Sequence, residues 1–133
     1  MERGEFEKAY LVIVEQAEEW SVISRRDGLL GLEDRLNEAK LAERDIFHFG
    51  MTIAIDGSDE PILNKILSNI IAQETDEEKK LLKIVQKESV LGIQCGMNPR
   101  LLAVLLWSYV DNKLANTASE NLLNKEAREE SNE

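Results

Sequence analysis

The sequence predicts an all-α fold, with a single compact domain of about six helices followed by a polar carboxyl-terminal segment. Only two prolines and seven glycines interrupt the 133 residues, which favours long helices over many short strands. Hydrophobic residues make up 43% of the chain and charged residues 32%, a balance typical of a folded protein with one core. Apolar residues also recur every three to four positions along most of the chain, as on one face of a helix.

The first expected helix covers residues 5–26. Its apolar residues follow the helical spacing and are Phe6, Tyr10, Ile13, Ala17 and Trp20. Arg25 and Arg26 stand where cations complement a helix carboxyl end, and Gly28 is placed for a left-handed cap. A second helix is expected from about Leu29 to Lys40. The pattern leaves open whether Gly28 breaks the helix or lies within it.

A third helix is expected over residues 42–55, ended by the turn residues Asp56 and Gly57. Residues 51–55 have the composition of a short buried strand, but no second convincing strand exists to pair with them. Ser58 or Asp59 is then expected to cap a fourth helix over 59–74, which tolerates Pro61 in its first turn.

Thr75-Asp-Glu-Glu78 has the form of a capping box and opens a fifth expected helix over residues 76–95, which Gly96 ends. Asn98 as N-cap and Pro99 as first helical residue start a sixth helix over 99–110. This helix is apolar on almost every side. We therefore expect it at the centre of the core, or half in the core and half against another chain.

Residues 1–112 are expected to form the folded domain, and residues 113–133 an acidic tail that is mobile or forms a short helix. Residues 117–120, Thr-Ala-Ser-Glu, are a second possible capping box within this tail. The final residues are nearly all polar, so we expect them to fray.

The net charge of −10 argues against a nucleic-acid backbone or an anionic membrane as partner and is more compatible with a basic protein surface. The longest apolar run, residues 101–107, is far shorter than the roughly 20 residues of a spanning helix. We expect no membrane span and a cytoplasmic location. The single cysteine, Cys95, excludes an internal disulfide and fits a reducing compartment.

No catalytic residue, metal ligand or cofactor-binding motif is predicted. His48 is the only histidine, so the chain lacks the residues of a histidine-rich metal site. Phosphate-binding loops, nucleophile elbows and dinucleotide fingerprints are also absent from the sequence. An enzyme of an unrecognised class stays as an alternative, and it would need a pocket that joins Cys95, His48 and a carboxylate.

Two stretches resemble the cytoplasmic segments of flagellar stator subunits, the motility protein A family (MotA, with its relatives TolQ and ExbB). The first block, residues 25–33, reads Arg-Arg-Asp-Gly-Leu-Leu-Gly-Leu-Glu and is followed in register by Asp45 to Asp59. The second block, residues 87–100, ends in Gly-Met-Asn-Pro-Arg and is similar to the family's carboxyl-terminal cytoplasmic helices. Both blocks keep the family order, but the pair of membrane helices that separates them in the family is missing here.

The resemblance implies a non-catalytic protein that cannot conduct ions and keeps the rotor-facing part of the family. By motif position, Arg25 and Glu33, with Arg26 beside them, are the expected partner-binding charges, and the rotor switch protein or the stator complex is the expected partner. The residues expected to have structural roles are Gly28, Asp56, Gly57, Gly96, Asn98 and Pro99. Two alternatives remain. In the first, these charges only cap a helix end and solvate an outer face of the protein. In the second, the chain is a homodimeric scaffold joined through helix 99–110 without motor contact.

Overall fold

The computed structural model describes residues 1–38 and 45–131 and confirms the all-α fold. In these residues the chain forms α-helices and one short 3-10 helix, η1, and no strand. The elements are α1 (Arg3–Asp27), η1 (Leu29–Leu32), α2 (Glu33–Glu38), α3 (Ile46–Ile55), α4 (Glu60–Ala72), α5 (Glu77–Gln94), α6 (Pro99–Trp107) and α7 (Asn112–Ser131).

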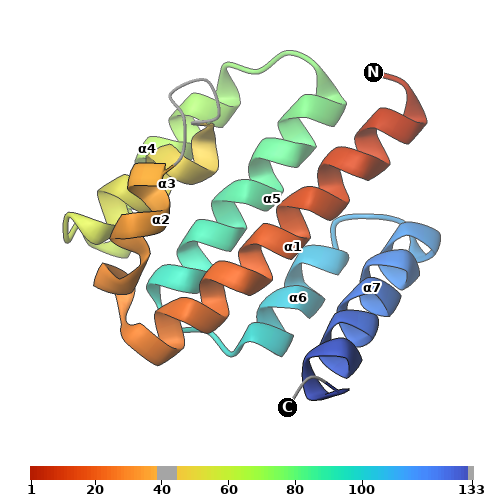
Figure 1. Ribbon diagram of the computed structural model, residues 1–133. Coiled ribbons are helices and arrows are strands. Elements are labelled where there is room, and N and C mark those ends of the chain that lie inside the picture. Colours follow the sequence, from red (N-terminus) through yellow and green to blue (C-terminus); the bar gives the residue numbers. More distant parts are fainter. Residues whose placement is uncertain (39–44, 132–133) are drawn as a thin grey trace.

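Helices α1 and α5 lie side by side through the middle of the molecule, with α6 and α7 on one side and α2, α3 and α4 on the other (Figure 1). Both helices bury several apolar side chains. Those of α1 are Phe6, Tyr10, Ile13, Val14, Ala17, Trp20 and Ile23, and those of α5 are Leu82, Val85, Val90 and Ile93. The α1–α5 pair is therefore the centre of the core.

The expectation that the sixth helix is central was wrong. Helix α6 buries Leu102, Ala103 and Leu106 against the rest of the molecule, whereas Leu101 and Val104 are 59% and 54% exposed. A helix that is apolar on all sides gives no periodic signal for which side is covered. Helices α1 and α5 bury more apolar side chains than α6, so they form the central pair, and α6 flanks them.

Polar side chains that cap the first turn explain where most of the helices begin. The Oδ1 of Asn98 accepts hydrogen bonds from the amides of Arg100 and Leu101, at 2.9 and 3.3 Å, so the expected N-cap of α6 is confirmed. Helix α5 is capped by Asp76, whose carboxylate accepts from the Lys79 amide at 2.9 Å, and not by Thr75. Asp59, with Pro61 close behind it, caps α4 as expected.

The chain changes direction at Gly28, between the end of α1 and the start of η1. The φ of 80° and ψ of 172° at Gly28 are not the left-handed cap that we expected, but the positive φ still favours glycine. The expected second helix is divided into η1 and α2, and its residues 39–40 lie outside the described residues. The expected start of the third helix at 42 also lies outside them, and α3 begins at Ile46 with Asp45 as its N-cap.

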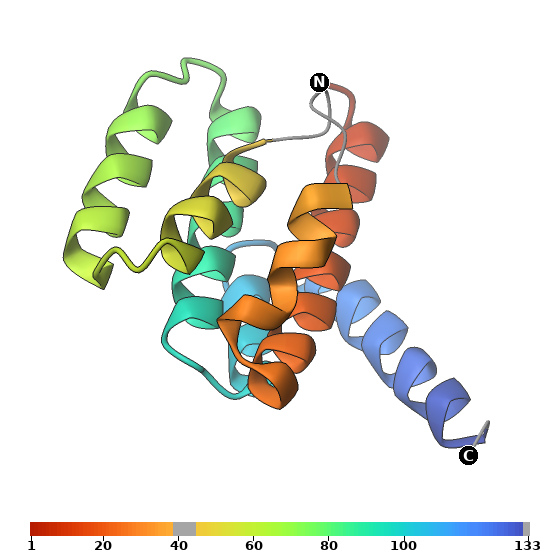
Figure 2. The ribbon, with the colours of Figure 1, turned by 60° about the vertical axis from the view of Figure 1, so that its left-hand side comes forward.

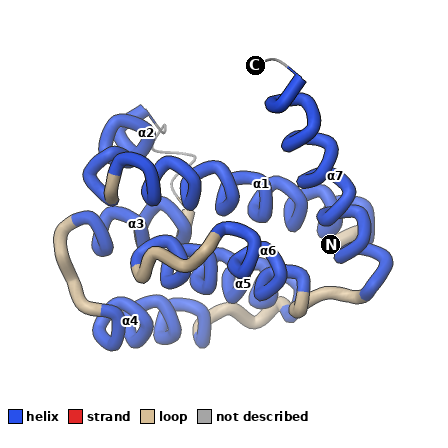
Figure 3. The backbone as a smooth tube through the Cα atoms, turned by 90° about the horizontal axis from the view of Figure 1, so that it is seen from below, coloured by secondary structure: helices blue, strands red, loops and turns tan. Residues whose placement is uncertain are grey.

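Residues Asn112–Ser131 form α7, a helix of 20 residues where we expected a mobile or short-helical tail. The Asp111 carboxylate accepts from the Leu114 amide at 3.0 Å at its start, so the expected capping box at 117–120 lies inside the helix. Leu114, Ala118 and Leu122, spaced by four, are buried and dock α7. Its carboxyl end is directed away from the other helices (Figures 2 and 3).

None of the helices in the described ranges 1–38 and 45–131 is long and apolar enough to cross a membrane.

Candidate functional site

The candidate site is the junction where α1 ends and η1 begins, which we call the charged junction (Arg25, Arg26, Asp27, Gly28 and Glu33). The Gly28 amide donates to the Ser24 carbonyl at 2.7 Å and closes the last turn of α1. The Gly31 amide then donates to the Gly28 carbonyl at 3.1 Å, which starts η1. Leu32 is fully buried, so the core holds η1 in place and sets where α2 starts.

Arg25 reaches across to the turn between α5 and α6. Its Nη1 donates to the Gly96 carbonyl oxygen at a distance of 2.6 Å. The Gly96 carbonyl lies in the turn just after α5, and a cation close to the carboxyl end of a helix complements the helix dipole. The contact brings residues 25–33 and 87–100, the two stretches of the sequence resemblance, together in space.

The Arg26 side chain forms its hydrogen bonds within its own helix, α1. Its Nε and Nη2 donate to the two carboxylate oxygens of Asp27 at 3.0 and 2.8 Å. These hydrogen bonds, with the charge of Arg26, lower the pKa of the Asp27 carboxyl against a smaller opposing effect of burial. Both side chains are well exposed, so this pair is worth little to folding.

Glu33 is the first residue of α2 and is exposed. An acidic side chain in the first turn complements the positive end of a helix, which gives Glu33 a structural role whether or not it meets a partner. On η1 the side chain of Leu30 is 69% exposed, next to a sharp turn and close in sequence to these charges. The junction thus presents charged groups and one apolar side chain to the solvent.

The residues expected to have structural roles lie at chain turns. Gly28, Gly57 and Gly96 have φ of 80°, 96° and 72°, a region that strongly favours glycine. Asp56 is the C-cap of α3, and its amide donates to the Thr52 carbonyl at 3.0 Å. Pro99 is the first residue of α6, directly after its Asn98 cap.

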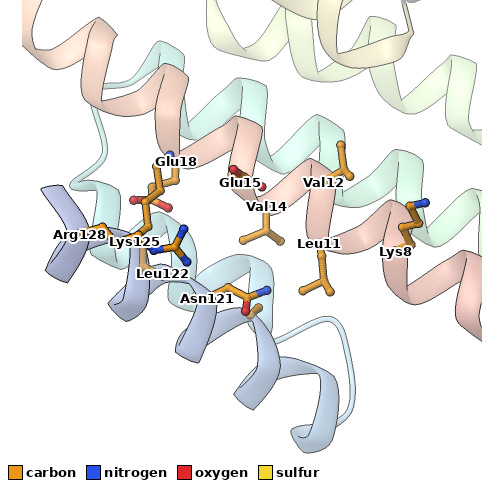
Figure 4. Close-up of a pocket in the computed structure, with 11 residues that line it drawn as sticks. Lys8, Leu11, Val12, Val14, Glu15, Glu18, Asn121, Leu122, Lys125 and Arg128 are labelled. Carbon is orange, nitrogen blue, oxygen red and sulfur yellow. The ribbon is translucent and has the colours of Figure 1, made fainter.

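A groove between α1 and α7 is a second candidate site, which sequence reasoning missed. Leu11 and Val14 point from α1 toward α7, where Leu122 lies, and Glu18 and Lys125 lie at one end of the groove (Figure 4). Its lining residues are Lys8, Leu11, Val12, Val14, Glu15, Glu18, Ala118, Asn121, Leu122, Lys125 and Arg128. In the sequence, Leu11, Val12 and Val14 widen the apolar side of the first helix beyond a single stripe, which is a signal that could have indicated the groove.

His48 belongs to a buried contact between α3, α1 and α5. Its ring meets Trp20 and Phe47 edge-on, with centroids 5.6 Å away in each case. The Asp45 carboxylate accepts from the His48 backbone amide at 3.1 Å, lies 2.9 Å from the ring Nδ1, and accepts from Gln86 Nε2 at 2.8 Å. Burial acts to raise the pKa of Asp45, but the hydrogen bonds from His48 and Gln86 outweigh it and lower this pKa.

This arrangement gives no support to the alternative of an enzyme based on Cys95 and His48. Cys95 is exposed at the carboxyl end of α5, and its Sγ lies 3.4 Å from the Gly92 carbonyl oxygen. The hollow that His48 lines, between α1 and α2, does not include Cys95. In the described part of the chain, no three histidine, cysteine or carboxylate side chains are grouped to hold a metal ion.

A scan against models of known protein families matches none of them. A search of curated proteins also finds no match.

Proposed function

We propose that this protein is a non-catalytic, cytoplasmic interaction protein of the bacterial flagellar motor, which binds the rotor switch protein or the stator complex through the charged junction. One observation supports this proposal above the others. The two stretches that resemble stator subunits are far apart in the sequence, yet Arg25 in one donates to the Gly96 carbonyl in the other at 2.6 Å. Two short motifs that resemble one family support a shared function more strongly when they contact each other in the fold than when they lie apart.

The junction has the properties of a surface for transient, charge-guided binding. Arg26 and Glu33 are exposed on neighbouring elements, and Leu30 adds an exposed apolar side chain. Charges at the rim of an interface chiefly set the association rate, the orientation and the choice of partner. Such a surface suits contact with a charged face of a larger assembly.

The test is a binding measurement between the full chain and the purified rotor switch protein at low ionic strength. Glu33→Lys should weaken binding about tenfold, because it reverses a charge that faces the partner. Glu120→Lys is the matched control, since it makes the same change at an exposed residue of α7. Absence of wild-type binding to both the switch protein and the stator complex would refute the proposal, and equal binding by all three proteins would refute the role of Glu33.

A homodimeric scaffold is the second candidate, and the exposed side of α6 favours it. Leu101 and Val104 are three residues apart on this helix and both are more than half exposed. Light scattering gives the mass in solution. If α6 is the dimer interface, Val104→Glu should turn a dimer into a monomer. A wild-type chain that is monomeric at high concentration rules this candidate out.

A further inference from the structure

We infer that Arg25 is a positioning residue of the charged junction, which holds the segment that displays Glu33, and that a partner does not meet its charge directly. The identity of the partner in this inference rests on the proposed function, but the positioning role rests on contacts within the chain. The motif resemblance alone implied the opposite, with Arg25 as a partner-binding charge.

The first observation that supports this inference is the position of the Arg25 guanidinium. Its Nη1 lies 2.6 Å from the Gly96 oxygen, directly after the last turn of α5. Gly96, with φ of 72°, lies in the turn that accepts this contact, and Gly28, with φ of 80°, follows the last turn of α1, from which Arg25 extends. Backbone amides already donate to the Leu91, Gly92 and Ile93 carbonyls at the end of α5, so the guanidinium acts on the turn beyond the helix and joins α1 to it.

The second support is the short path from Arg25 to Glu33. Gly28 follows Arg25 by three residues, and the four residues of η1 then lead directly to Glu33 at the start of α2. Leu32 anchors η1 from inside the core, and Arg25 fixes the preceding helix end to the α5–α6 turn. The direction in which Glu33 points therefore depends on both anchors.

Arg26 offers a matched comparison in the same turn of the same helix. Its guanidinium binds the carboxylate of the adjacent Asp27, so this contact joins no two elements. Loss of the Arg26 side chain should leave the junction geometry unchanged. Arg25→Gln and Arg26→Gln remove the same charge from adjacent positions, which separates the effect of geometry from that of charge.

The first experiment needs no partner and follows backbone amide exchange in the full chain by mass spectrometry. In Arg25→Gln, exchange should become on the order of tenfold faster both in residues 28–33 and in residues 96–98, because the contact that joins them is lost. Arg26→Gln should leave both segments at the wild-type rate, and Arg25→Lys should restore slow exchange in part. Unchanged exchange in Arg25→Gln would overturn the inference.

The second experiment is a double-mutant cycle of binding to the purified rotor switch protein. Arg25→Gln should weaken binding about three- to tenfold in the wild-type chain and have no further effect in the Glu33→Lys chain, since Arg25 acts through Glu33. Additive losses would show a direct contact by Arg25 and overturn the inference. If the wild-type chain binds neither the switch protein nor the stator complex, the proposed function fails, and the exchange experiment alone decides the role of Arg25.

Discussion

The hydroxyl of Tyr10 donates a hydrogen bond of 3.0 Å to the carbonyl oxygen of Leu106, inside the core between α1 and α6. Tyr10 is fully buried and Leu106 nearly so. Leu106 lies in the last turn of α6, where the backbone offers its oxygen only a long bond from the Tyr109 amide, at 3.4 Å. The tyrosine therefore provides the main short hydrogen bond to this buried acceptor and attaches α6 to the central pair.

Replacement of this tyrosine by phenylalanine should lower the free energy of unfolding. Tyr10→Phe keeps the ring packing but leaves the Leu106 oxygen without its side-chain donor, at a cost of about 1–2 kcal/mol. Urea unfolding followed by circular dichroism measures the change as a lower midpoint at constant slope. An unchanged midpoint would show that the hydrogen bond adds nothing to stability.

The same residue predicts a loss of stability at alkaline pH. Burial raises the pKa of the Tyr10 hydroxyl far above its ordinary value, so the native state resists its ionisation. As the pH rises through about 10, tyrosine ionises in the unfolded chain, and the free energy of unfolding falls. Wild type should lose more stability than Tyr10→Phe over this range. The tyrosinate absorbance of Tyr10, taken as the difference between the two proteins because the half-buried Tyr109 also absorbs, should rise only as the chain unfolds. Equal pH profiles would contradict this prediction.

Helices α5 and α6 approach each other closely at Gly92. A Cβ atom there would lie 2.6 Å from Leu102 Cδ1, and Leu102 is itself buried. Although alanine is the better helix former by about 1 kcal/mol, Gly92→Ala should destabilise the fold by about 1–2 kcal/mol, because the core must move to accept the methyl group. Gly4→Ala in α1 is the control, since nothing lies within 4 Å of its Cβ, and it should be neutral or stabilising. Equal stability of the two variants would contradict the prediction.

Local signals in the sequence were enough for most of the fold. Caps such as Asn98 and Asp59 depend on residues two or three positions away, so the starts of α6 and α4 could be predicted. The length of helix α7 was underestimated because Leu114, Ala118 and Leu122 form a sparse apolar stripe in a polar segment. A stripe of this kind becomes helical through packing against α1 and α6, which its own sequence does not show.

The candidate site was predictable only in part. A glycine near the end of the first helix could be predicted to favour a turn, although the sequence left open whether Gly28 breaks the helix or lies within it. The partner of Arg25 could not be predicted, because Gly96 is 71 positions away and offers only a backbone carbonyl. The groove beside α7 depends on the angle at which two helices diverge, and apolar periodicity gives no information about that angle.

The Asp45 carboxylate should stabilise the native state and lose this effect in acid. It caps α3 and also accepts a hydrogen bond of 2.8 Å from Gln86 on α5, so Asp45→Ala should cost about 1–2 kcal/mol. Its pKa is lowered in the native state, so the stabilisation is complete above the ordinary pKa of 3.8 and is lost as the pH falls through the lower native value. Urea unfolding at several pH values should show a steeper acid loss for wild type than for Asp45→Asn. Parallel curves would contradict the prediction.

One charge introduced into the buried face of α7 should detach this helix from the rest of the fold. Ala118 lies in the middle of its docked stripe, and Ala118→Asp places a carboxylate at a position that is 3% exposed in the native chain. Burial of Leu114, Ala118 and Leu122 contributes only a few kcal/mol to the docking of α7. A free helix of this length is marginal in water. We therefore expect α7 to unfold, with lower helicity and rapid proteolysis near residues 108–112, while α1–α6 stay folded. Asn116→Asp, on the exposed side of the same helix, should keep wild-type resistance, and equal resistance of both variants would show that α7 docks by other contacts.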